Sequence, residues 1–349
     1  MREAGFRVLT KTTGSKPVII LPRGGEAEIQ RKGPPSILEQ RKIVKLASKL
    51  GVQALVVELM GIQPECLKVE SSRLLRPHIL VITNVRLDHL DQMGKTKREI
   101  AESLANSFPK RGTIFIPQDE FFPEFEKRAK KLNSKIVQIS RDAFEKILDG
   151  KTNLPYNEFE DNIRIALAAS EFLGVKKEVA LKGMSEAHPD FGSLKIWTAS
   201  FGSPAHSWLL VSAFAANEPE STSKILSVLK GKIPFARREL VGLINFREDR
   251  GDRTLQWLNA LKEGSFTEFQ RVVFIGGHAH ALNSRIKKKP SWLAGIPLAV
   301  ITDKQPAKIM LKVSSMVNGD AVIVGMGNMG GLGKELVEYW EKIGSPYGA

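Results

Sequence analysis

Short apolar runs alternate with amphipathic segments along the first half of the chain. The apolar runs are rich in β-branched side chains, which is typical of buried strands, and they lie at 18–21, 54–57, 79–82, 113–117 and 134–139. In the segments between them apolar residues recur at helical spacing, which predicts helices at 37–50, 95–108, 122–132, 157–174 and 177–187. This alternation predicts an α/β fold with a mostly parallel sheet and helices on both faces.

The pattern restarts after the turn-forming stretch at 188–192. New apolar runs end in polar or glycine-rich sequences, at 208–211, 240–245, 272–275, 299–301 and 321–324. We therefore expect two domains, at residues 1–190 and 191–349, the second a smaller α/β domain. Residues 191–203 are expected to connect them and to allow them to move relative to each other, as in enzymes that close around a substrate.

Length and composition are those of a soluble globular protein. The 349 residues can form two or three domains with their own cores, and 42% of them are hydrophobic and 26% charged. No apolar run approaches the roughly 18 residues of a membrane span, and the N-terminus lacks the apolar core of a signal peptide. A single cysteine, Cys66, excludes an internal disulfide framework. We expect a cytoplasmic protein.

The net charge of +14 is compatible with nucleic acid, a membrane surface or an acidic substrate as partner. Lysines and arginines are spread along the chain, and the densest run, at 285–289, has no aromatic residues interleaved with it. This pattern argues against a single-strand nucleic-acid platform, which stacks bases on aromatic side chains. We expect no nucleic-acid partner.

A polar cluster follows the apolar run at 79–82 and consists of Asn84, Asp88, His89 and Asp91. In open α/β sheets ligands bind outside the carboxyl ends of the strands, and an imidazole with carboxylates can hold a divalent metal or tune a proton. Glu58 ends the run at 54–57 in the same way, where a buried carboxylate must be paired or metal-bound. The alternatives are a loop-capping His89 with solvated aspartates, and a Glu58 that pairs with an arginine.

Three further patterns admit two interpretations each. Residues 11–15, KTTGS, form a strand-end loop that could offer backbone N–H groups to an anion, although an ordinary turn is favoured. The burst at 247–254, REDRGDRT, fits phosphate contacts supported by salt bridges, or a surface ion-pair network. The glycines at 325–331 resemble a dinucleotide fingerprint, but no βαβ unit follows, so a turn with close backbone approach is favoured. His278 and His280 are interpreted as loop residues.

Taken in order, these pieces resemble the ligase subunits of bacterial poly-γ-glutamate (capsule) synthases, the PgsB/CapB type, in the Mur ligase superfamily. The matching segments are KTTG at 11–14, EQ at 39–40, ELM at 58–60, NVRLDHLDQMG at 84–94, DN at 161–162, PDFG at 189–192, FAAN at 214–217, NFREDRGDRT at 245–254 and GMGN at 325–328. The resemblance covers nearly the whole chain. It implies a Mur-ligase-like central domain with a P-loop-type sheet, at 1–190, and a Rossmann-like C-terminal domain.

The resemblance also implies the chemistry. Such ligases use ATP to activate a glutamate carboxylate as an acyl phosphate and join it to a glutamate amine, and Mg²⁺ neutralises charge in the phosphoryl transfer. The implied roles are Glu58 and His89 as Mg²⁺ ligands and, with Asp88, catalytic residues; Lys11, Thr12, Thr13 and Asn84 on the substrate side; and Asn162, Asn217, Arg247, Asp252 and Arg253 for ATP. The implied partners are glutamate, poly-γ-glutamate and membrane-bound synthase subunits, which would bring the protein to the inner face of the membrane, and possible further copies of the chain.

Two features depart from the family pattern. The family has a P-loop strand, GxxGKST, and a membrane segment upstream of the position of Met1, and the sequence contains neither. No lysine occurs at 103–106, where several superfamily ligases have a carbamylated lysine, so none is predicted. Because a P-loop supplies N–H groups and a lysine to the phosphates, we expect this chain alone to be inactive as a ligase. We also expect an exposed apolar sheet edge near Val8 and Val18.

Two alternative functions remain. One is a non-catalytic scaffold or regulatory remnant, and the other is an oxidoreductase, which rests only on the glycines at 325–331.

Overall fold

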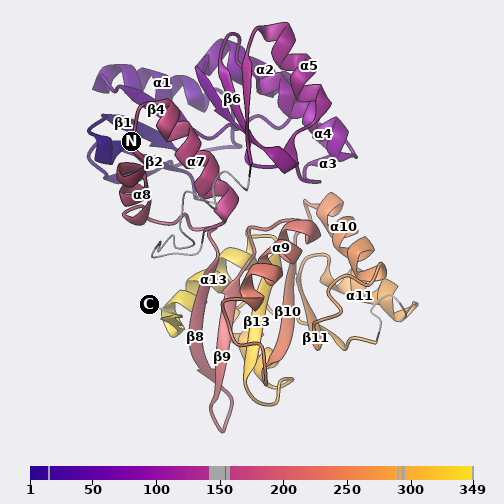
Figure 1. Ribbon diagram of the computed structural model, residues 1–349. Coiled ribbons are helices and arrows are strands. Elements are labelled where there is room, and N and C mark those ends of the chain that lie inside the picture. The colour runs from indigo at the N-terminus through magenta and orange to yellow at the C-terminus, as the bar shows by residue number, and fades with distance from the viewer. Residues whose placement is uncertain (15, 141–153, 155–157, 290, 292–294, 348–349) are drawn as a thin grey trace. The chain divides into compact units, whose positions relative to one another are not determined.

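The computed structural model describes residues 1–14, 16–140, 154, 158–289, 291 and 295–347. The chain divides into two compact units, Met1–Phe191 and Gly192–Ala349 (Figure 1). Each unit is described by itself.

The first sheet of unit 1 has four strands in the order β3-β2-β1-β4. Its strands are β1 (Val8–Lys11), β2 (Val18–Ile20), β3 (Glu26–Glu28) and β4 (Ala54–Val57). β1 runs parallel to β4 and antiparallel to β2, and β2 is antiparallel to β3. Helix α1 (Glu39–Leu50) covers one face, where its Ile43 and Ala47 pack with Leu9. The helix ends at Gly51, whose left-handed backbone (φ 56°) suits glycine.

The second sheet of unit 1 has three parallel strands in the order β5-β6-β7. They are β5 (Ile79–Val81), β6 (Thr113–Pro117) and β7 (Lys135–Ile139). Alternate residues of β6 face opposite sides: Ile114 packs with Phe125 of α5 (Pro123–Leu132), whereas the ring of Phe115 meets that of Phe172 at 5.6 Å. Phe172 ends α7 (Glu160–Phe172), so this sheet has helices on both faces.

The remaining elements of unit 1 are short helical segments. They are η1 (Arg2–Ala4), α2 (Pro64–Val69), the π-helix η2 (Glu70–Leu75), α3 (Leu90–Met93), α4 (Lys97–Leu104), η3 (Ala105–Ser107), η4 (Gln118–Glu120) and α8 (Lys177–Ser185). Thr96 begins α4 with a capping box to Glu99. The helix predicted at 95–108 therefore starts two residues later and ends in a 3₁₀ turn.

The positions of β2, β4, β5, β6 and β7 were predicted, whereas β3 and the grouping of the strands into sheets were not. We expected one sheet, and the described strands form two, in which β4 and β5 are outer strands. No described strand pairs with their second edges, and Val56 and Val81 are 47% and 39% exposed. The exposed edge expected near Val8 and Val18 is wrong, because β1 and β2 are each paired on both sides.

Unit 2 contains one seven-stranded sheet in the order β12-β11-β10-β13-β9-β8-β14. The strands β9 (His206–Ser212), β10 (Glu239–Phe246), β11 (Arg271–Gly276), β12 (Leu298–Val300) and β13 (Ala321–Gly327) are parallel. β8 (Lys195–Phe201) and β14 (Ser345–Pro346) add an antiparallel side. β13 is buried along its whole length, as expected for a parallel strand with both faces covered.

A helix follows each of the parallel strands of unit 2 (Figure 1). These helices are α9 (Pro219–Lys230), α10 (Gly251–Lys262), α11 (Ala279–Lys287), α12 (Pro306–Ser314) and α13 (Leu332–Ile343). The α/β fold class with parallel sheets is therefore confirmed.

Two predictions for unit 2 are wrong. Residues 195–201, expected within a connecting segment, form β8, which pairs along its length with β9. His280 lies inside α11 rather than in a loop, and His278 is the residue before that helix. In both places polar or small residues interrupt the periodic pattern of apolar residues. The strand forms because it pairs with a neighbouring strand, and the helix forms because it packs on the sheet.

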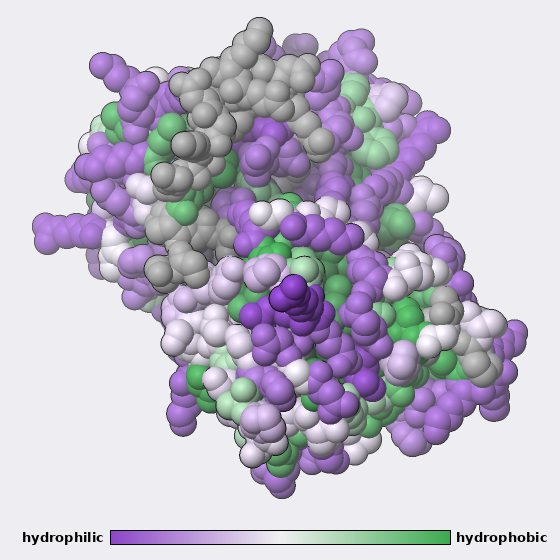
Figure 2. All heavy atoms as spheres, turned by 60° about the horizontal axis from the view of Figure 1, so that its bottom comes forward, coloured by the Kyte–Doolittle hydropathy of each residue, from purple (hydrophilic) through white to green (hydrophobic). Residues whose placement is uncertain are grey.

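Figure 2 shows hydrophilic residues over much of the visible face, with hydrophobic ones interspersed among them. Within the described ranges, every helix is too short or too polar to cross a lipid bilayer.

Candidate active site

Glu58 follows directly after β4, and the parallel pairing of β4 with β1 brings it beside the loop after Lys11. The Glu58 amide donates to the Lys11 carbonyl at 3.0 Å, and the Thr13 amide donates to Glu58 Oε2 at 2.5 Å. Glu58 is exposed to solvent, and no described arginine forms an ion pair with it. The strand-end position thus presents this carboxylate on a fixed backbone.

Lys11, at the start of this loop, is turned into the interior of unit 1. Its side chain is buried, with 1% of the residue exposed, and Nζ lies 3.3 Å from Glu39 Oε1. Burial lowers the pKa of Lys11, while hydrogen bonds from Arg31 lower the pKa of Glu39. Thr12 lies in the turn to β2, where its hydroxyl accepts from the Val18 amide at 3.1 Å. The lysine expected on the substrate side is therefore placed in the interior.

The loop after β5 carries Asn84, Asp88 and His89. His89 has a left-handed backbone (φ 54°), which side chains other than glycine rarely adopt and which is often found at functional sites. Asp88 Oδ1 accepts from the His89 amide at 2.8 Å, and Asp88 Oδ2 lies 3.7 Å from His89 Nε2. His89 precedes α3 without a side-chain cap hydrogen bond, and Asn84, on the exposed side of the loop, donates to Thr83. The loop-capping alternative for His89 thus has no support in the cap geometry.

If Glu58 and His89 share one metal ion, the strands before them should be neighbours in one sheet, but β4 and β5 belong to different sheets. Among the described residues no three His, Cys, Asp or Glu side chains gather where they could hold a metal ion. The donors present fit Mg²⁺ in one respect: Glu58 offers an exposed carboxylate, and Mg²⁺ commonly takes one or two carboxylates, keeping water and phosphate oxygens as its other ligands.

In unit 2 the ends of β10 and β13 are joined by a buried polar network. Asn245 Nδ2 donates to the Asn328 carbonyl at 2.7 Å and to the Gly330 carbonyl at 3.1 Å, and Asn328 Nδ2 donates to the Asn245 carbonyl at 3.0 Å. Arg253 Nη1 donates to Asn328 Oδ1 at 2.9 Å. Arg253, predicted to bind ATP, is therefore buried in this network.

The other charges of the 247–254 segment form local pairs. Arg247 donates twice to Asp249, and Arg250 donates twice to Asp252. The Arg247 hydrogen bonds hold the pKa of Asp249 below its ordinary value. Burial raises the pKa of Asp252, but hydrogen bonds from Arg250 and the Arg253 amide outweigh it and lower the pKa. Both aspartates stay charged beside their arginines at neutral pH.

The glycines at 325–331 are explained by close packing. A Cβ on Gly325 would overlap the Phe214 ring and lie 2.9 Å from Trp340, and one on Gly330 would overlap the Arg247 guanidinium. The predicted close approach is confirmed, but Gly325 and Gly327 lie in β13, and the turn begins only after them. The Gly330 turn accommodates the side chain of Arg247.

The remaining predicted residues lie on helices or next to them. Asn162 is in the first turn of α7, where Nδ2 donates to Glu158 Oε1 at 2.8 Å. Asn217 precedes α9, and its carbonyl accepts from Trp257 Nε1 at 3.1 Å.

Sequence reasoning missed two buried carboxylates beside the strand-end loops, Glu70 and Glu120. A signal was present for each. Glu70 shares a helical face with Leu67 and Leu74, and Glu120 lies between the apolar run at 113–117 and two phenylalanines. Such positions predict burial, and a buried carboxylate must have partners.

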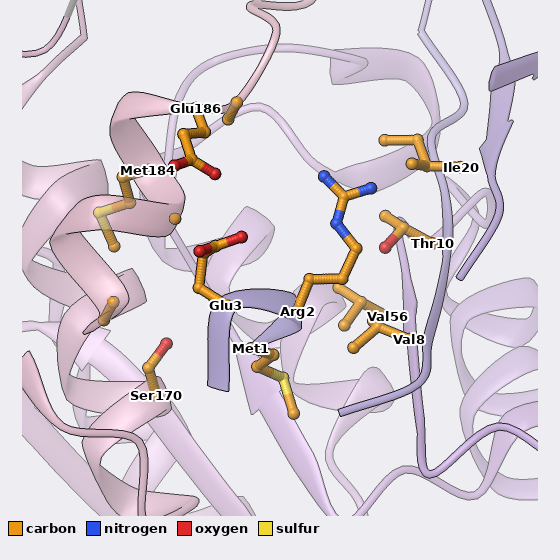
Figure 3. Close-up of a pocket in the computed structure, with 13 residues that line it drawn as sticks. Met1, Arg2, Glu3, Val8, Thr10, Ile20, Val56, Ser170, Met184 and Glu186 are labelled. Atoms are coloured by element: carbon orange, nitrogen blue, oxygen red, sulfur yellow. The ribbon is translucent and has the colours of Figure 1, made fainter. Parts of the chain in front are cut away.

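A cavity of about 280 Å³ lies elsewhere in unit 1 (Figure 3). Val8, Ile20 and Val56 from the first sheet form one side, and Met184 of α8 and Glu186 lie on the other. None of the predicted site residues lines it, and we assign it no role in the site.

Two family descriptions match the chain. The Mur ligase middle domain matches residues 8–187, and the poly-gamma-glutamate synthase CapB C-terminal domain matches residues 199–343. The PGA synthase CapB of Bacillus subtilis (strain 168) is 31% identical over 342 residues, covering 96% of this chain and 84% of that protein. The capsule biosynthesis protein CapB of Bacillus anthracis is 29% identical over 343 residues, covering 97% of this chain and 71% of that protein.

Solved structures agree on the fold. The bifunctional folylpolyglutamate synthase/dihydrofolate synthase of Yersinia pestis, complexed with AMPPNP and Mn ion, matches with a TM-score of 0.65 at 12% identity. The match covers 97% of this chain and 83% of that one. MurF of Acinetobacter baumannii matches with a TM-score of 0.53 at 17% identity, and this chain spans 65% of it. On these matches, the chain belongs to the Mur ligase family, and within it to the CapB group of poly-γ-glutamate synthases.

Proposed function

We propose that the protein is an ATP-dependent amide ligase that extends poly-γ-glutamate. The names of the two Bacillus relatives support the polymer, and the nucleotides bound by structural neighbours support ATP. The observation that carries the proposal is that candidate residues in both units lie at the carboxyl ends of parallel strands, Glu58 after β4 and the 247–254 segment after β10. Such ends are where open α/β sheets bind ligands.

In the proposed reaction a glutamate carboxylate oxygen attacks the γ-phosphorus of ATP. The bond between that phosphorus and the bridging oxygen breaks, and ADP leaves with the electron pair. The amine of a second glutamate then attacks the acyl carbon, a C–N bond forms, phosphate leaves and the nitrogen loses a proton. Catalysis of this kind depends mainly on positioning and charge neutralisation.

The chain's own residues would divide this work. Glu58 and His89 would hold Mg²⁺, which supplies positive charge to the phosphate oxygens, and Asp88 would orient His89. Asn84, Thr12 and Thr13 would face the substrate. The buried Lys11 would not touch the substrate, and it would instead hold the backbone of the 11–15 loop in place. The proposed ATP-binding residues are Asn162, Asn217, Arg247, Asp252 and Arg253.

An isotope experiment tests the acyl phosphate. Glutamate labelled with ¹⁸O in the carboxylate is incubated with ATP, Mg²⁺ and the protein joined at its N-terminus to a segment that carries a P-loop. We expect ADP release with ¹⁸O in the phosphate, because the oxygen that attacks ATP leaves with phosphorus. ADP release with unlabelled phosphate would indicate simple hydrolysis and contradict the mechanism.

The competing function is a non-catalytic scaffold, for which the lack of a P-loop sequence in these 349 residues is the supporting observation. The test compares residues 1–349 alone with the same chain joined to a P-loop segment. If neither protein released ADP but both bound poly-γ-glutamate, the scaffold function would be favoured. Glutamate, the polymer and membrane-bound synthase subunits remain the proposed partners, together with possible further copies of the chain.

A further inference from the structure

Glu70 lies fully buried at the start of η2, with 0% of the residue exposed. Its carboxylate accepts from the Met60 amide at 2.9 Å and from the Gly61 amide at 2.6 Å. Gln40 Nε2 donates to Glu70 at 2.7 Å and to the Glu58 carbonyl at 3.0 Å. The segment from Glu58 to Gly61 is therefore held through its backbone by one carboxylate and one amide.

Glu120 plays the equivalent part for the other loop. It lies buried in η4, and its Oε2 accepts from the Val85 amide at 3.0 Å. Arg86 Nη1 lies 2.5 Å from Glu120 Oε1 and also donates to the Val85 carbonyl at 3.0 Å. This backbone leads directly into His89.

The same physical argument applies to Glu70 and Glu120. A buried carboxylate requires hydrogen-bond donors, and loss of the carboxylate leaves buried N–H groups unsatisfied. The carboxylate and the loop amides therefore hold each other in place. In each case the amide donors belong to the loop that bears a proposed metal ligand, within four residues of Glu58 or His89. Gly61 permits the approach, because a Cβ there would lie 3.0 Å from Glu70 Oε2 and 2.8 Å from the Leu67 amide.

We propose that Glu70 and Glu120 are positioning residues that hold the Glu58 and His89 loops ready for a divalent cation. The proposal rests on the function proposed above, and it adds two residues that touch neither cation nor substrate. Outer partners of metal ligands commonly matter, and their loss typically weakens metal binding by about 10- to 100-fold.

The test compares Glu70→Gln and Glu120→Gln with Glu65→Gln, in the purified full chain. Glu65 is an exposed carboxylate on α2, so its substitution changes the charge equally without altering either loop. Amide hydrogen exchange is measured at Met60, Gly61 and Val85, and Mn²⁺ binding by electron paramagnetic resonance. We expect faster exchange in the matching loop and Mn²⁺ binding weakened about 10- to 100-fold in both variants, with no change in Glu65→Gln.

Glu58→Ala and His89→Ala distinguish a failure of the proposed metal site from a failure of the positioning role of Glu70 and Glu120. If these variants weaken Mn²⁺ binding while Glu70→Gln and Glu120→Gln do not, the positioning role is overturned and the metal site stands. If the unaltered chain binds no Mn²⁺, or Glu58→Ala and His89→Ala leave binding unchanged, the metal site of the proposed function fails, and the positioning role fails with it. Unchanged exchange at Met60, Gly61 and Val85 would overturn the positioning role directly.

Discussion

Lys11 is a buried cation that forms an ion pair with Glu39. Burial lowers its pKa below the ordinary 10.5, so between the folded and unfolded pKa values the unfolded chain binds more protons. Stability should therefore rise with pH through that window and level off above about 10.5. Lys11→Met should remove this rise.

Urea unfolding at a series of pH values between 8 and about 10.5, the unfolded lysine pKa, checks this prediction. Lys49→Met, at an exposed position of α1, is the control that should leave the rise in place. A rise that persists in Lys11→Met would assign it to other groups.

Two substitutions of His89 distinguish the role of its imidazole in turnover from the strain of its left-handed backbone. Both His89→Ala and His89→Gly remove the imidazole, but only glycine adopts the left-handed backbone without strain. We expect both to lose Mg²⁺-dependent turnover in a P-loop-bearing chain, by about 10²-fold or more. His89→Gly should be about 1 kcal/mol more stable to unfolding than His89→Ala.

Turnover is followed by ADP release and stability by urea unfolding. Activity retained in either variant would remove His89 from the proposed mechanism. Equal stability of the two variants would show that the loop relaxes when the imidazole is lost.

At the scale of elements, Arg253 links α10 to the loop after β13. Its hydrogen bond to Asn328 Oδ1 is charged and buried, and such bonds contribute about 1.5–3 kcal/mol. Arg253→Ala should therefore lower the free energy of unfolding of unit 2 by about that amount, in addition to any loss of turnover. The sequence left a phosphate contact and a surface ion pair open for this segment and did not predict burial of Arg253, because that burial depends on Asn328, which is distant in the chain.

Urea unfolding followed by tryptophan fluorescence measures the effect. Substitution of the exposed Arg98, which pairs with Glu124 in unit 1, is the control. Unchanged stability in Arg253→Ala would restore the functional interpretation.

The centre of β13 tolerates no side chain at Gly325, because Phe214 and Trp340 occupy the space. Gly325→Ala should destabilise by about 1–3 kcal/mol through overpacking. Gly251→Ala, at the start of α10 with no atom within 4 Å of the added Cβ, should be neutral or slightly stabilising.

Thermal unfolding of both variants provides the comparison. Equal melting temperatures would show that Phe214 and Trp340 move aside at little cost.

Single elements were predictable where burial follows from local composition. The strands at 54–57 and 113–117 were predicted to the residue, because every position is apolar or β-branched. β8 was missed because its apolar positions are interrupted by Thr198 and Ser200, and its strand state depends on pairing with β9. Glu58 and His89 could be placed after strands for the same reason that the strands could be found. The partners of Glu70 and Glu120 could not, because they join segments up to 35 residues apart.

At the scale of the whole molecule, the lack of a G-x-x-x-x-G-K-[ST] sequence leads to a prediction about residues 1–349. Without those N–H groups and that lysine, the β- and γ-phosphates lose several charge stabilisers, each worth about 10² to 10³ in rate. We expect no measurable ADP release from this chain with glutamate, ATP and Mg²⁺.

The same chain joined to an N-terminal P-loop segment is the comparison, and it should release ADP. Robust turnover by residues 1–349 alone would mean that other residues hold the phosphates. The sequence could not predict that the strands of unit 1 separate into two sheets, because strand order depends on which edges meet in the folded unit.

The strand order of unit 2 also affects how the protein is made. β13 lies between β9 and β10, yet it is synthesised after β12. Until residues 321–327 leave the ribosome, the slot between β9 and β10 is empty, and two buried strands face it with unpaired edges. All strands of unit 1 are made before this point, and domains tend to fold in order of synthesis. We therefore expect that a ribosome stalled before residue 321 leaves an incomplete sheet with unpaired strand edges, which is prone to aggregate.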